Sequence, residues 1–201
     1  EPDVLIRLGF RILRGEILTT PKYGVWSFHH GDNYINRGGP AGFWESMGYW
    51  PTTGSILQIL NEDLDNGQVL YRSKSTTNEF SYRDNVNNFF WKSLHFLPRK
   101  LKQLHSLGDK EFFRRVKAEN QHPCFYSNRL YTSPSNTELA RLTVNKIIQK
   151  AKHLYYNSRY FDQWVLKFDL RDTMSTSMWR FKTILPPKNK FWADPHIICK
   201  D

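Results

Sequence analysis

A short apolar run that ends in polar residues constrains the fold of this chain more than any other feature. Residues 24–28 are apolar or aromatic apart from Ser27, a pattern that is typical of a buried β-strand. His29 and His30 follow directly, and a turn-like stretch with Asp32 comes next. Ligands of open α/β sheets bind beyond the carboxyl ends of the strands. The sequence therefore predicts a functional site at the end of this strand.

The segments around this strand alternate between strand and helix patterns. Apolar runs predict three more strands, at residues 4–6, 55–60 and 68–72. Apolar residues at helical spacing predict helices at 40–47 and 85–117. The second is expected to kink or restart at Pro98, and Gly108 is the expected cap after which a further helix begins. Thr137 is the expected cap of a further helix over 138–155. Strands and helices in this order predict an α/β fold.

The charge of the chain favours anionic partners. The 201 residues carry a formal net charge of +10, but the Lys and Arg residues are scattered rather than gathered in blocks. A scattered pattern is typical of solvated helix faces. No recognisable nucleic-acid module and no interleaving of aromatic and basic residues is present, which argues against a nucleic-acid partner. Phosphorylated sugars and polyanionic cofactors remain as expected partners.

Cysteine usage and hydropathy bear on the compartment. Cys124 and Cys199 have neither the spacing of a zinc site nor the density of a disulfide scaffold. No apolar run is long enough to span a bilayer, so no membrane span and a cytoplasmic location are expected. The chain begins without Met and ends within a strand-like stretch, so we expect it to be part of a longer protein.

The chemistry of the predicted site has several interpretations. His29 with Asp65 makes an acid–base pair in which the carboxylate orients the imidazole, and the Ser27 hydroxyl is a donor for a developing oxyanion. Adjacent histidines on a strand point to opposite faces, so one of His29 and His30 is expected to be structural. A metal held by His29, Asp32 and Asp65 has unspecific spacing, and no metal is predicted. Asp65 also fits a plain turn.

Residues 2–70 resemble the latter part of the formyltransferase fold. That family includes methionyl-tRNA, glycinamide ribonucleotide and amino-sugar formyltransferases. Residues 2–13 resemble its Pro-Asp strand and folate-binding loop, and Ser27-Phe28-His29 resembles its Asn-x-His signature. Arg37-Gly38, Thr53-Gly54 and Asp65-Asn66-Gly67 resemble its later Arg-Gly, Thr-Gly and Asp-x-Gly motifs, in the same order. The spacing from His29 to Asp65 also resembles that of the family.

The resemblance implies a fold and a set of roles. Residues 1–118 are expected to form the carboxyl-terminal half of a Rossmann-like formyltransferase sheet, with an amino-terminal half upstream. The implied catalytic residues are Ser27, His29 as general base or proton shuttle, and Asp65 as its orienting partner. The implied cofactor is 10-formyltetrahydrofolate, bound by Gly9, Phe10, Ile12, Leu13, Asp63 and Leu64. The implied acceptor is the amine of a nucleotide-linked amino sugar, bound by His30, Arg37 and Gly38.

Two departures from the family pattern motivate an alternative function. Ser27 stands where the family has Asn, and residues 32–34 replace its usual Leu-Leu-Pro. The alternative is a degenerate formyltransferase-like module that binds sugar or docks a second, sugar-active domain. Ser27→Asn separates the two hypotheses.

The last part of the chain carries a second resemblance. Residues 119–160 are expected to be a linker and a helix. In residues 161–201, Trp164-Val165-Leu166 and the later Phe191–Pro195 stretch resemble the opening blade of a five-bladed β-propeller. Similar propellers occur in family 43 glycosidases and in glucosamine inositolphosphorylceramide transferases. Asp194 holds the place of the glycosidase general base, although an Asp-Pro turn explains it equally well. The chain is thus expected to belong to a multidomain carbohydrate-modifying protein.

Overall fold

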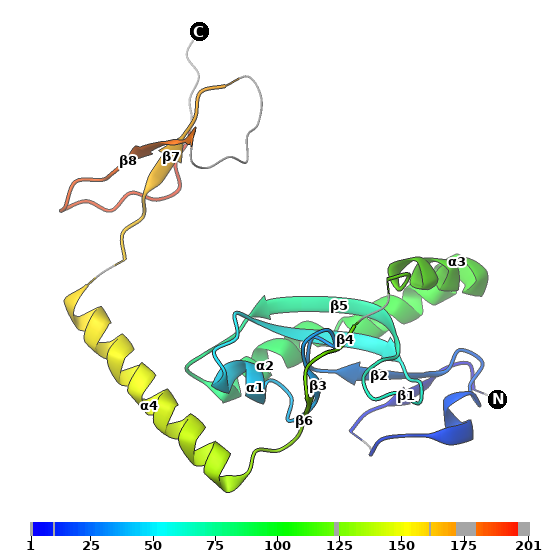
Figure 1. The fold of residues 1–201 in the computed structure, drawn as a ribbon. Coiled ribbons are helices and arrows are strands. Elements are labelled where there is room, and N and C mark those ends of the chain that lie inside the picture. Colours follow the sequence, from blue (N-terminus) through cyan, green and yellow to red (C-terminus); the bar gives the residue numbers. More distant parts are fainter. Residues whose placement is uncertain (1, 10, 123–124, 161, 172–179, 197–201) are drawn as a thin grey trace. The chain divides into compact units, whose positions relative to one another are not determined.

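The computed structural model describes residues 2–9, 11–122, 125–160, 162–171 and 180–196 (Figure 1). The chain divides into two compact units, Glu1–Lys150 and Ala151–Asp201, and each unit is described by itself.

The first unit is built on a four-stranded mixed sheet of order β1-β2-β4-β5. The strands are β1 (Leu5–Arg7), β2 (Val25–His29), β4 (Thr52–Ile59) and β5 (Gln68–Thr76). The β1 strand runs parallel to β2, whereas β4 is antiparallel to both β2 and β5. All four strands predicted from apolar runs are present, and the mixed α/β class with a partial sheet is confirmed. The β4–β5 ladder shifts register between Leu57 and Gln58.

Helices and short elements complete this unit. A 3-10 helix (Gly15–Leu18) and α1 (Phe43–Met47) precede the long pair α2 (Tyr82–Ser93) and α3 (Phe96–Glu119). The backbone of α3 is non-helical at Gly108, with φ of 74°, so the predicted break at this glycine is confirmed. The predicted break at Pro98 is misplaced, because the helices separate at Leu94 and His95. Pro98 instead lies in the first turn of α3, where a missing N–H costs no intrahelical hydrogen bond. A small parallel pair joins β3 (Arg37–Gly38) to β6 (Leu130–Tyr131).

The helix α4 (Asn136–Arg159) begins earlier than predicted. Its cap is Ser135 rather than Thr137, because the Ser135 hydroxyl accepts the Glu138 backbone N–H at 3.2 Å. On the same helix, the Lys146 ammonium donates to the Ser46 carbonyl of α1 at 2.6 Å. This bond ties the first half of α4 to the sheet unit.

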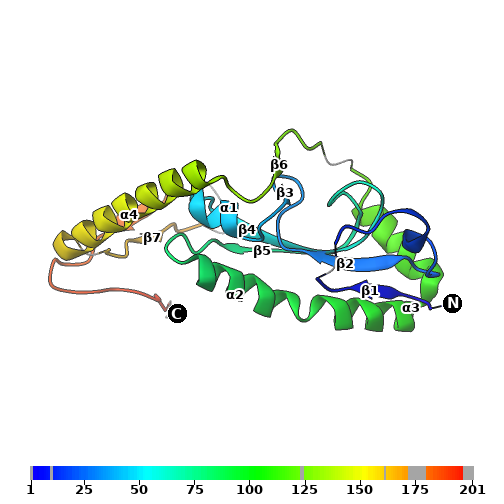
Figure 2. The ribbon, with the colours of Figure 1, turned by 90° about the horizontal axis from the view of Figure 1, so that it is seen from below.

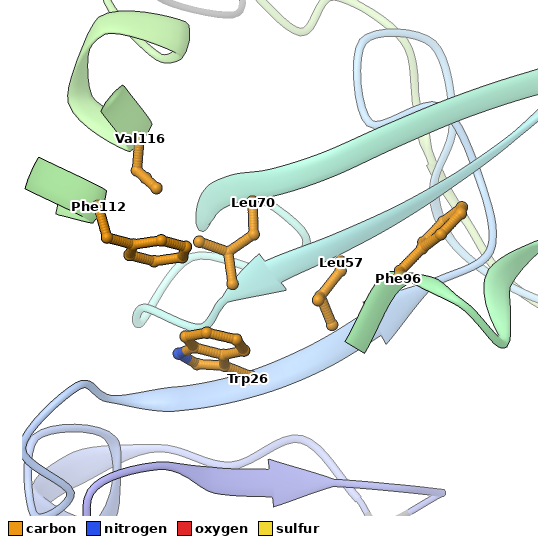
Figure 3. Close-up of a cluster of buried hydrophobic side chains, with 6 residues drawn as sticks. All are labelled: Trp26, Leu57, Leu70, Phe96, Phe112 and Val116. Atoms are coloured by element: carbon orange, nitrogen blue, oxygen red, sulfur yellow. The ribbon is translucent and has the colours of Figure 1, made fainter. Parts of the chain in front are cut away.

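The hydrophobic core lies between one face of the sheet and α3 (Figures 2 and 3). The sheet contributes Trp26, Leu57 and Leu70, and α3 contributes Phe96, Phe112 and Val116. The rings of Trp26 and Phe112 stack with centroids 5.9 Å apart. Burying each of these side chains stabilises the fold by about 1.5–3 kcal/mol. Because successive strand residues point to opposite faces, Ser27, His29 and Gln58 lie on the face away from α3.

The second unit contains a two-stranded antiparallel ribbon of β7 (Leu166–Phe168) and β8 (Lys182–Ile184). The β7 strand lies within the predicted run at residues 164–168. Asp194 adopts a left-handed backbone conformation, with φ of 51°. The strand predicted to follow it lies largely outside the described residues, so the propeller stays a prediction. No helix in the described part of the chain is long and apolar enough to cross a membrane.

Candidate active site

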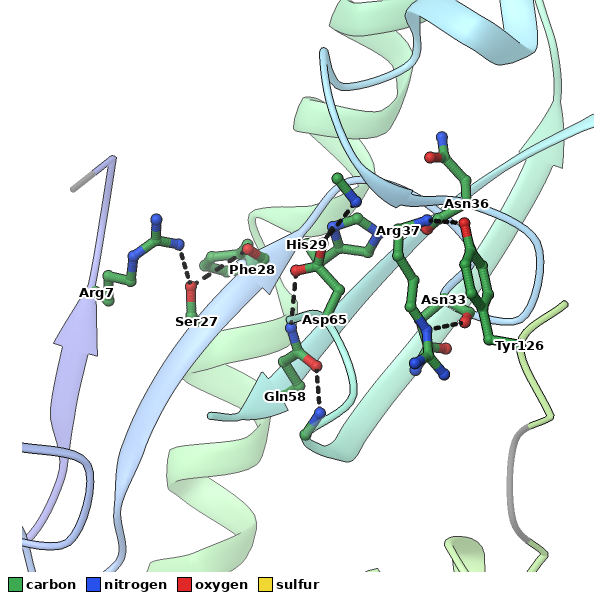
Figure 4. Close-up of polar contacts among 12 residues, drawn as sticks. Arg7, Ser27, Phe28, His29, Asn33, Asn36, Arg37, Gln58, Asp65 and Tyr126 are labelled. Atoms are coloured by element: carbon green, nitrogen blue, oxygen red, sulfur yellow. Dashed lines mark hydrogen bonds and ion pairs between the residues drawn. The ribbon is translucent and has the colours of Figure 1, made fainter. Parts of the chain in front are cut away.

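A buried histidine and an aspartate meet at the end of β2 (Figure 4). His29 is the last residue of this strand, and its side chain is almost fully buried. Its Nδ1 lies 3.2 Å from Oδ2 of Asp65. Its Nε2 lies 2.8 Å from the backbone carbonyl oxygen of Asn36. The structure thus brings together two of the three predicted catalytic residues, from positions that are distant in the sequence.

Asp65 is held in place by the loop between β4 and β5. Its backbone is left-handed, with φ of 52°, a conformation that Asp tolerates better than most residues. Its Oδ2 accepts the Gly38 backbone N–H at 2.9 Å, and its Oδ1 accepts from Gln58 Nε2 at 3.5 Å. Gln58 also accepts the Gly67 N–H at 3.1 Å, so this one side chain of β4 holds both Asp65 and Gly67.

Both ring nitrogens of His29 lie close to oxygen atoms. Nε2 faces the Asn36 carbonyl and Nδ1 faces the Asp65 carboxylate. An imidazole N–H donates to such oxygens. The two contacts therefore fix the orientation of the ring.

Ser27 is turned toward a different neighbour. Its hydroxyl accepts from Nη1 of Arg7 at 3.1 Å and contacts the Phe28 carbonyl at 3.3 Å. Figure 4 shows Ser27 facing the β1 strand while His29, further along β2, faces Asp65. The structure therefore separates the hydroxyl of Ser27 from the His29–Asp65 pair.

His30 points to the opposite face of the sheet from His29, as expected for adjacent strand residues. Its ring stacks on Phe28 and Phe89 and meets the edge of Phe90, with centroids 4.5–5.8 Å apart. Its Nδ1 lies 2.9 Å from the Ser55 hydroxyl. Burial, with a smaller contribution from the charge of His29, lowers the pKa of His30 to about 4. This ring is neutral at neutral pH.

Arg37 and Gly38 lie beside the pair. The Arg37 guanidinium donates to the Asn33 carbonyl at 3.0 Å and to Asn66 Oδ1 at 2.9 Å, and it stacks on the Tyr126 ring. Gly38 has φ of 102°, and a Cβ there would lie 2.1 Å from the Tyr131 carbonyl oxygen. Close approach of β3 and β6 therefore requires glycine at this position.

The third carboxylate considered for a metal site has other partners. Asp32 is buried and forms ion pairs with Arg72 and Lys74, both at 2.6 Å. Within the described residues, no group of three or more His, Cys, Asp and Glu side chains is arranged to hold a metal ion.

The residues predicted to bind folate lie in two exposed segments that meet. Ile12 is 56% exposed, and the backbone groups of Ile12 and Leu13 form no hydrogen bonds among the described residues. The Gly15 N–H donates to Glu62 Oε1 at 2.9 Å, which ties this segment to the loop of Asp63 and Leu64. Gly9 lies at the start of the first segment, and Phe10 lies outside the described residues.

Two of the cavities among the described residues adjoin the predicted site residues. A polar cleft of about 560 Å³ lies beside the Asp65 loop. Carboxamides line it, among them Asn33 and Asn66, together with the cations Arg72 and Lys117 and with His122. An apolar cleft of about 570 Å³ is lined by residues of β1, β2 and the α2–α3 junction. Gly9, Ser27 and His30 line the apolar cleft, together with Phe90, Leu94 and Leu97.

Three residues of the site escaped sequence reasoning. Asn36 contributes a backbone carbonyl, Gln58 is one of many strand residues, and Tyr126 lies 89 residues from the Arg37 N–H that its hydroxyl accepts. No motif marks any of them. The alternation of β2 and β4, which places Gln58 on the face of His29, was the one available signal.

Comparisons with known proteins give fold-level likenesses. No protein-family model and no curated protein matches the chain. A HypX variant from Aquifex aeolicus is 16% identical with a TM-score of 0.48 over 88% of this chain and 32% of its own. HypX from the same organism in complex with tetrahydrofolic acid is 24% identical, with a TM-score of 0.37 over 41% of this chain and 14% of its own. This chain thus spans less than a third of the length of HypX.

One further solved structure is a formyltransferase. PseJ from Anoxybacillus kamchatkensis, in complex with UDP-4,6-dideoxy-4-formamido-L-AltNAc and tetrahydrofolate, is 16% identical with a TM-score of 0.44. The match covers 80% of this chain and 72% of PseJ. Likenesses at such low identity concern the fold alone.

Proposed function

We propose that this protein transfers a formyl group from 10-formyltetrahydrofolate to an amine, with His29 and Asp65 as its catalytic pair. The observation that carries the proposal is the 3.2 Å contact between these two side chains. His29 and Asp65 meet at the carboxyl end of β2. Both lie in the ordered motifs by which the sequence resembles formyltransferases. A buried His–Asp contact made across the sheet is what acid–base work requires.

The transfer balances without a further reactant. The amine nitrogen forms a bond to the formyl carbon, the bond from that carbon to the donor nitrogen breaks, and the proton lost by the amine ends on the donor nitrogen. The folate supplies the formyl group. His29 donates a hydrogen bond from Nε2 to the formyl oxygen as negative charge develops on it, and Asp65 orients the ring through its contact with Nδ1. To do so, Nε2 exchanges the Asn36 carbonyl for the substrate oxygen.

The exposed segment around Ile12 fits the flat heteroaromatic ring of a folate. Its apolar side chains are open to solvent, and its free backbone N–H and C=O groups are available to the edge of such a ring. We assign the folate to Gly9, Phe10, Ile12 and Leu13 on one side and to the loop of Asp63 and Leu64 on the other.

We assign the acceptor to the polar cleft. Its volume is in the range of small-molecule sites, roughly 300–1,000 Å³. The cations Arg72 and Lys117 line it, and no carboxylate does so among the described residues. Cations with many carboxamides suit the phosphates and hydroxyls of a nucleotide-linked amino sugar. Arg37 reaches the rim of this cleft through its bonds to Asn33 and Asn66.

The test measures formyl transfer to a panel of nucleotide amino sugars by mass spectrometry. Loss of a donor to a developing oxyanion costs about 2.7–4 kcal/mol, so His29→Asn is expected to lower turnover roughly 10²–10³-fold. His105→Asn, which changes an exposed histidine of α3, is the matched control and keeps full turnover. Equal turnover of wild type and His29→Asn overturns the assignment.

A second candidate function is a non-catalytic sugar-binding or docking module. Two observations favour it: Arg7 occupies the hydroxyl of Ser27, and the Asn36 carbonyl occupies Nε2 of His29. In this alternative, a propeller-like domain containing Asp194 acts on the sugar. A large gain of formyl transfer in Ser27→Asn identifies a weakened enzyme. If neither the wild type nor Ser27→Asn binds a non-reactive folate analogue in calorimetry, the result favours the non-catalytic module.

A further inference from the structure

Two buried polar side chains next to His29 share one hydrogen bond and leave one atom each without a partner. Nδ2 of Asn36 donates to Oε1 of Glu45 at 2.7 Å. Each residue is 1% exposed. Oδ1 of Asn36 and Oε2 of Glu45 are both buried and have no hydrogen-bond partner among the described residues. An unpartnered buried oxygen costs about 1–3 kcal/mol, so two in one pair need an explanation.

A charged carboxylate does not fit this place. Among the described residues Glu45 forms no ion pair, and an isolated buried carboxylate is strongly disfavoured. The groups around it offer no positive charge: the Asp32 carboxylate is of like sign, and Tyr82 of α2 and Tyr131 of β6 are neutral. Two cations of neighbouring segments have other partners: Lys146 donates to Ser46, and Arg129 forms an ion pair with Glu138.

Burial accordingly raises the pKa of Glu45, against the smaller opposing effect of the Asn36 hydrogen bond. This direction agrees with the geometry, because a neutral carboxyl group is both a donor and an acceptor, whereas a carboxylate only accepts.

We infer that Glu45 is protonated in the folded protein and forms a reciprocal pair with Asn36. The carboxyl O–H of Glu45 donates to Oδ1 of Asn36, while Nδ2 of Asn36 donates to Oε1 of Glu45. One proton thereby satisfies both unpartnered oxygens. The two planar groups then meet edge to edge, as a carboxylic acid and a carboxamide do when each donates to the other.

This pair makes Glu45 a positioning residue for His29, an assignment that rests on the proposed function. The backbone carbonyl of Asn36 is the acceptor for His29 Nε2. The Asn36 side chain, locked to α1 through Glu45, fixes that carbonyl. Before the substrate oxygen replaces the Asn36 carbonyl, the ring is therefore oriented from two sides, by the Asp65 carboxylate at Nδ1 and by the α1 helix at Nε2.

Glutamine tests the protonation state because it imitates a protonated glutamate. Its carboxamide has the same shape as a protonated carboxyl group, with an NH₂ donor in place of the O–H and a C=O acceptor. Infrared difference spectra at pH 6 between the wild type and Glu45→Gln are expected to show the C=O band of a protonated carboxylic acid in the wild type alone. Glu119→Gln, at an exposed position of α3, keeps the band. Absence of such a band in the wild type overturns the inference.

The positioning role is tested by the ring N–H signal of His29 in ¹⁵N-labelled protein. Glu45→Gln is expected to keep the Nε2–H signal and the melting temperature, whereas Glu45→Leu loses the signal through exchange with water. Loss of the signal or of the fold in Glu45→Gln, or an unchanged signal in Glu45→Leu, overturns it. If Glu45→Leu does not fold, Glu45→Gln and the infrared band decide. These readouts need no turnover, so they remain decisive even if the protein transfers no formyl group.

Discussion

Replacing Asp65 by Asn tests how much the charge of the candidate site contributes to stability. The Asp65 carboxylate accepts from the Gly38 N–H at 2.9 Å and contacts His29 Nδ1 at 3.2 Å. Asn preserves the shape, tolerates the left-handed backbone and keeps one oxygen acceptor. The variant therefore isolates the loss of negative charge from the loss of packing.

The magnitude follows from these two contacts. A hydrogen bond to a charged group contributes about 1.5–3 kcal/mol, and a neutral one about 1 kcal/mol. Making both contacts neutral lowers the free energy of unfolding by about 2 kcal/mol. For a chain of this size, each kcal/mol shifts the melting temperature by roughly 2–4 °C, so Asp65→Asn is expected to melt about 4–8 °C lower.

The assay is urea and thermal unfolding followed by the fluorescence of the buried tryptophans, Trp26 and Trp44. Asp63→Asn is the matched control, because Asp63 lies in the same loop, is exposed and has its nearest side-chain contact at 3.4 Å from Asn66. Its effect should stay within about 0.5 kcal/mol. If the two variants unfold at the same urea concentration, the carboxylate does not support the site as described.

Three more predictions concern the surroundings of the site. Burial holds the pKa of His30 at about 4, below its unfolded value of 6.5, so its contribution is full above pH 6.5 and is lost as the pH falls toward 4. The loss amounts to about 3 kcal/mol, and His30→Phe should flatten this part of a stability–pH curve measured by urea unfolding. Glu45, whose pKa is raised, gives the opposite slope, with stability lost as the pH rises. Gly38→Ala places a Cβ against the Tyr131 carbonyl and should separate β3 from β6. Hydrogen exchange at the Gly39 N–H, which donates to Tyr131, should then become faster. The control is Gly15→Ala, where a Cβ meets open space, and it should leave the exchange of the Gly39 N–H unchanged.

The sequence predicts those parts of the structure that depend on local patterns of residues. Alternation and apolar runs located the strands, and the motif order paired His29 with Asp65 before their contact was known. Contacts that depend on how distant segments fold back escaped prediction. The guanidinium of Arg7 reaches Ser27 because β1 and β2 pair in parallel, and the carbonyl of Asn36 carries no side-chain signature at all.

The errors at helix ends have a similar origin. Pro98 and Thr137 are reasonable boundary residues by type, but nearby positions compete for the same role. Ser135 reaches the amide of Glu138, and the first turn of α3 accommodates Pro98 without loss of a hydrogen bond. The preferences of residue types for helix ends differ little between such candidates, so the geometry of the backbone decides between them.

The strand order affects when His29 and Asp65 come together during folding. The β4–β5 hairpin joins neighbours in sequence, so we expect it to close early, because local pairings cost little loop entropy. Asp65 sits in the loop of that hairpin, whereas His29 arrives on β2, which must first dock along β4. The pair is therefore completed late, after the hairpin exists and β2 has found its register. A variant that weakens the β2–β4 seam would accumulate a species with an intact hairpin and an unassembled site, visible as early protection of β5 amides and delayed protection of β2.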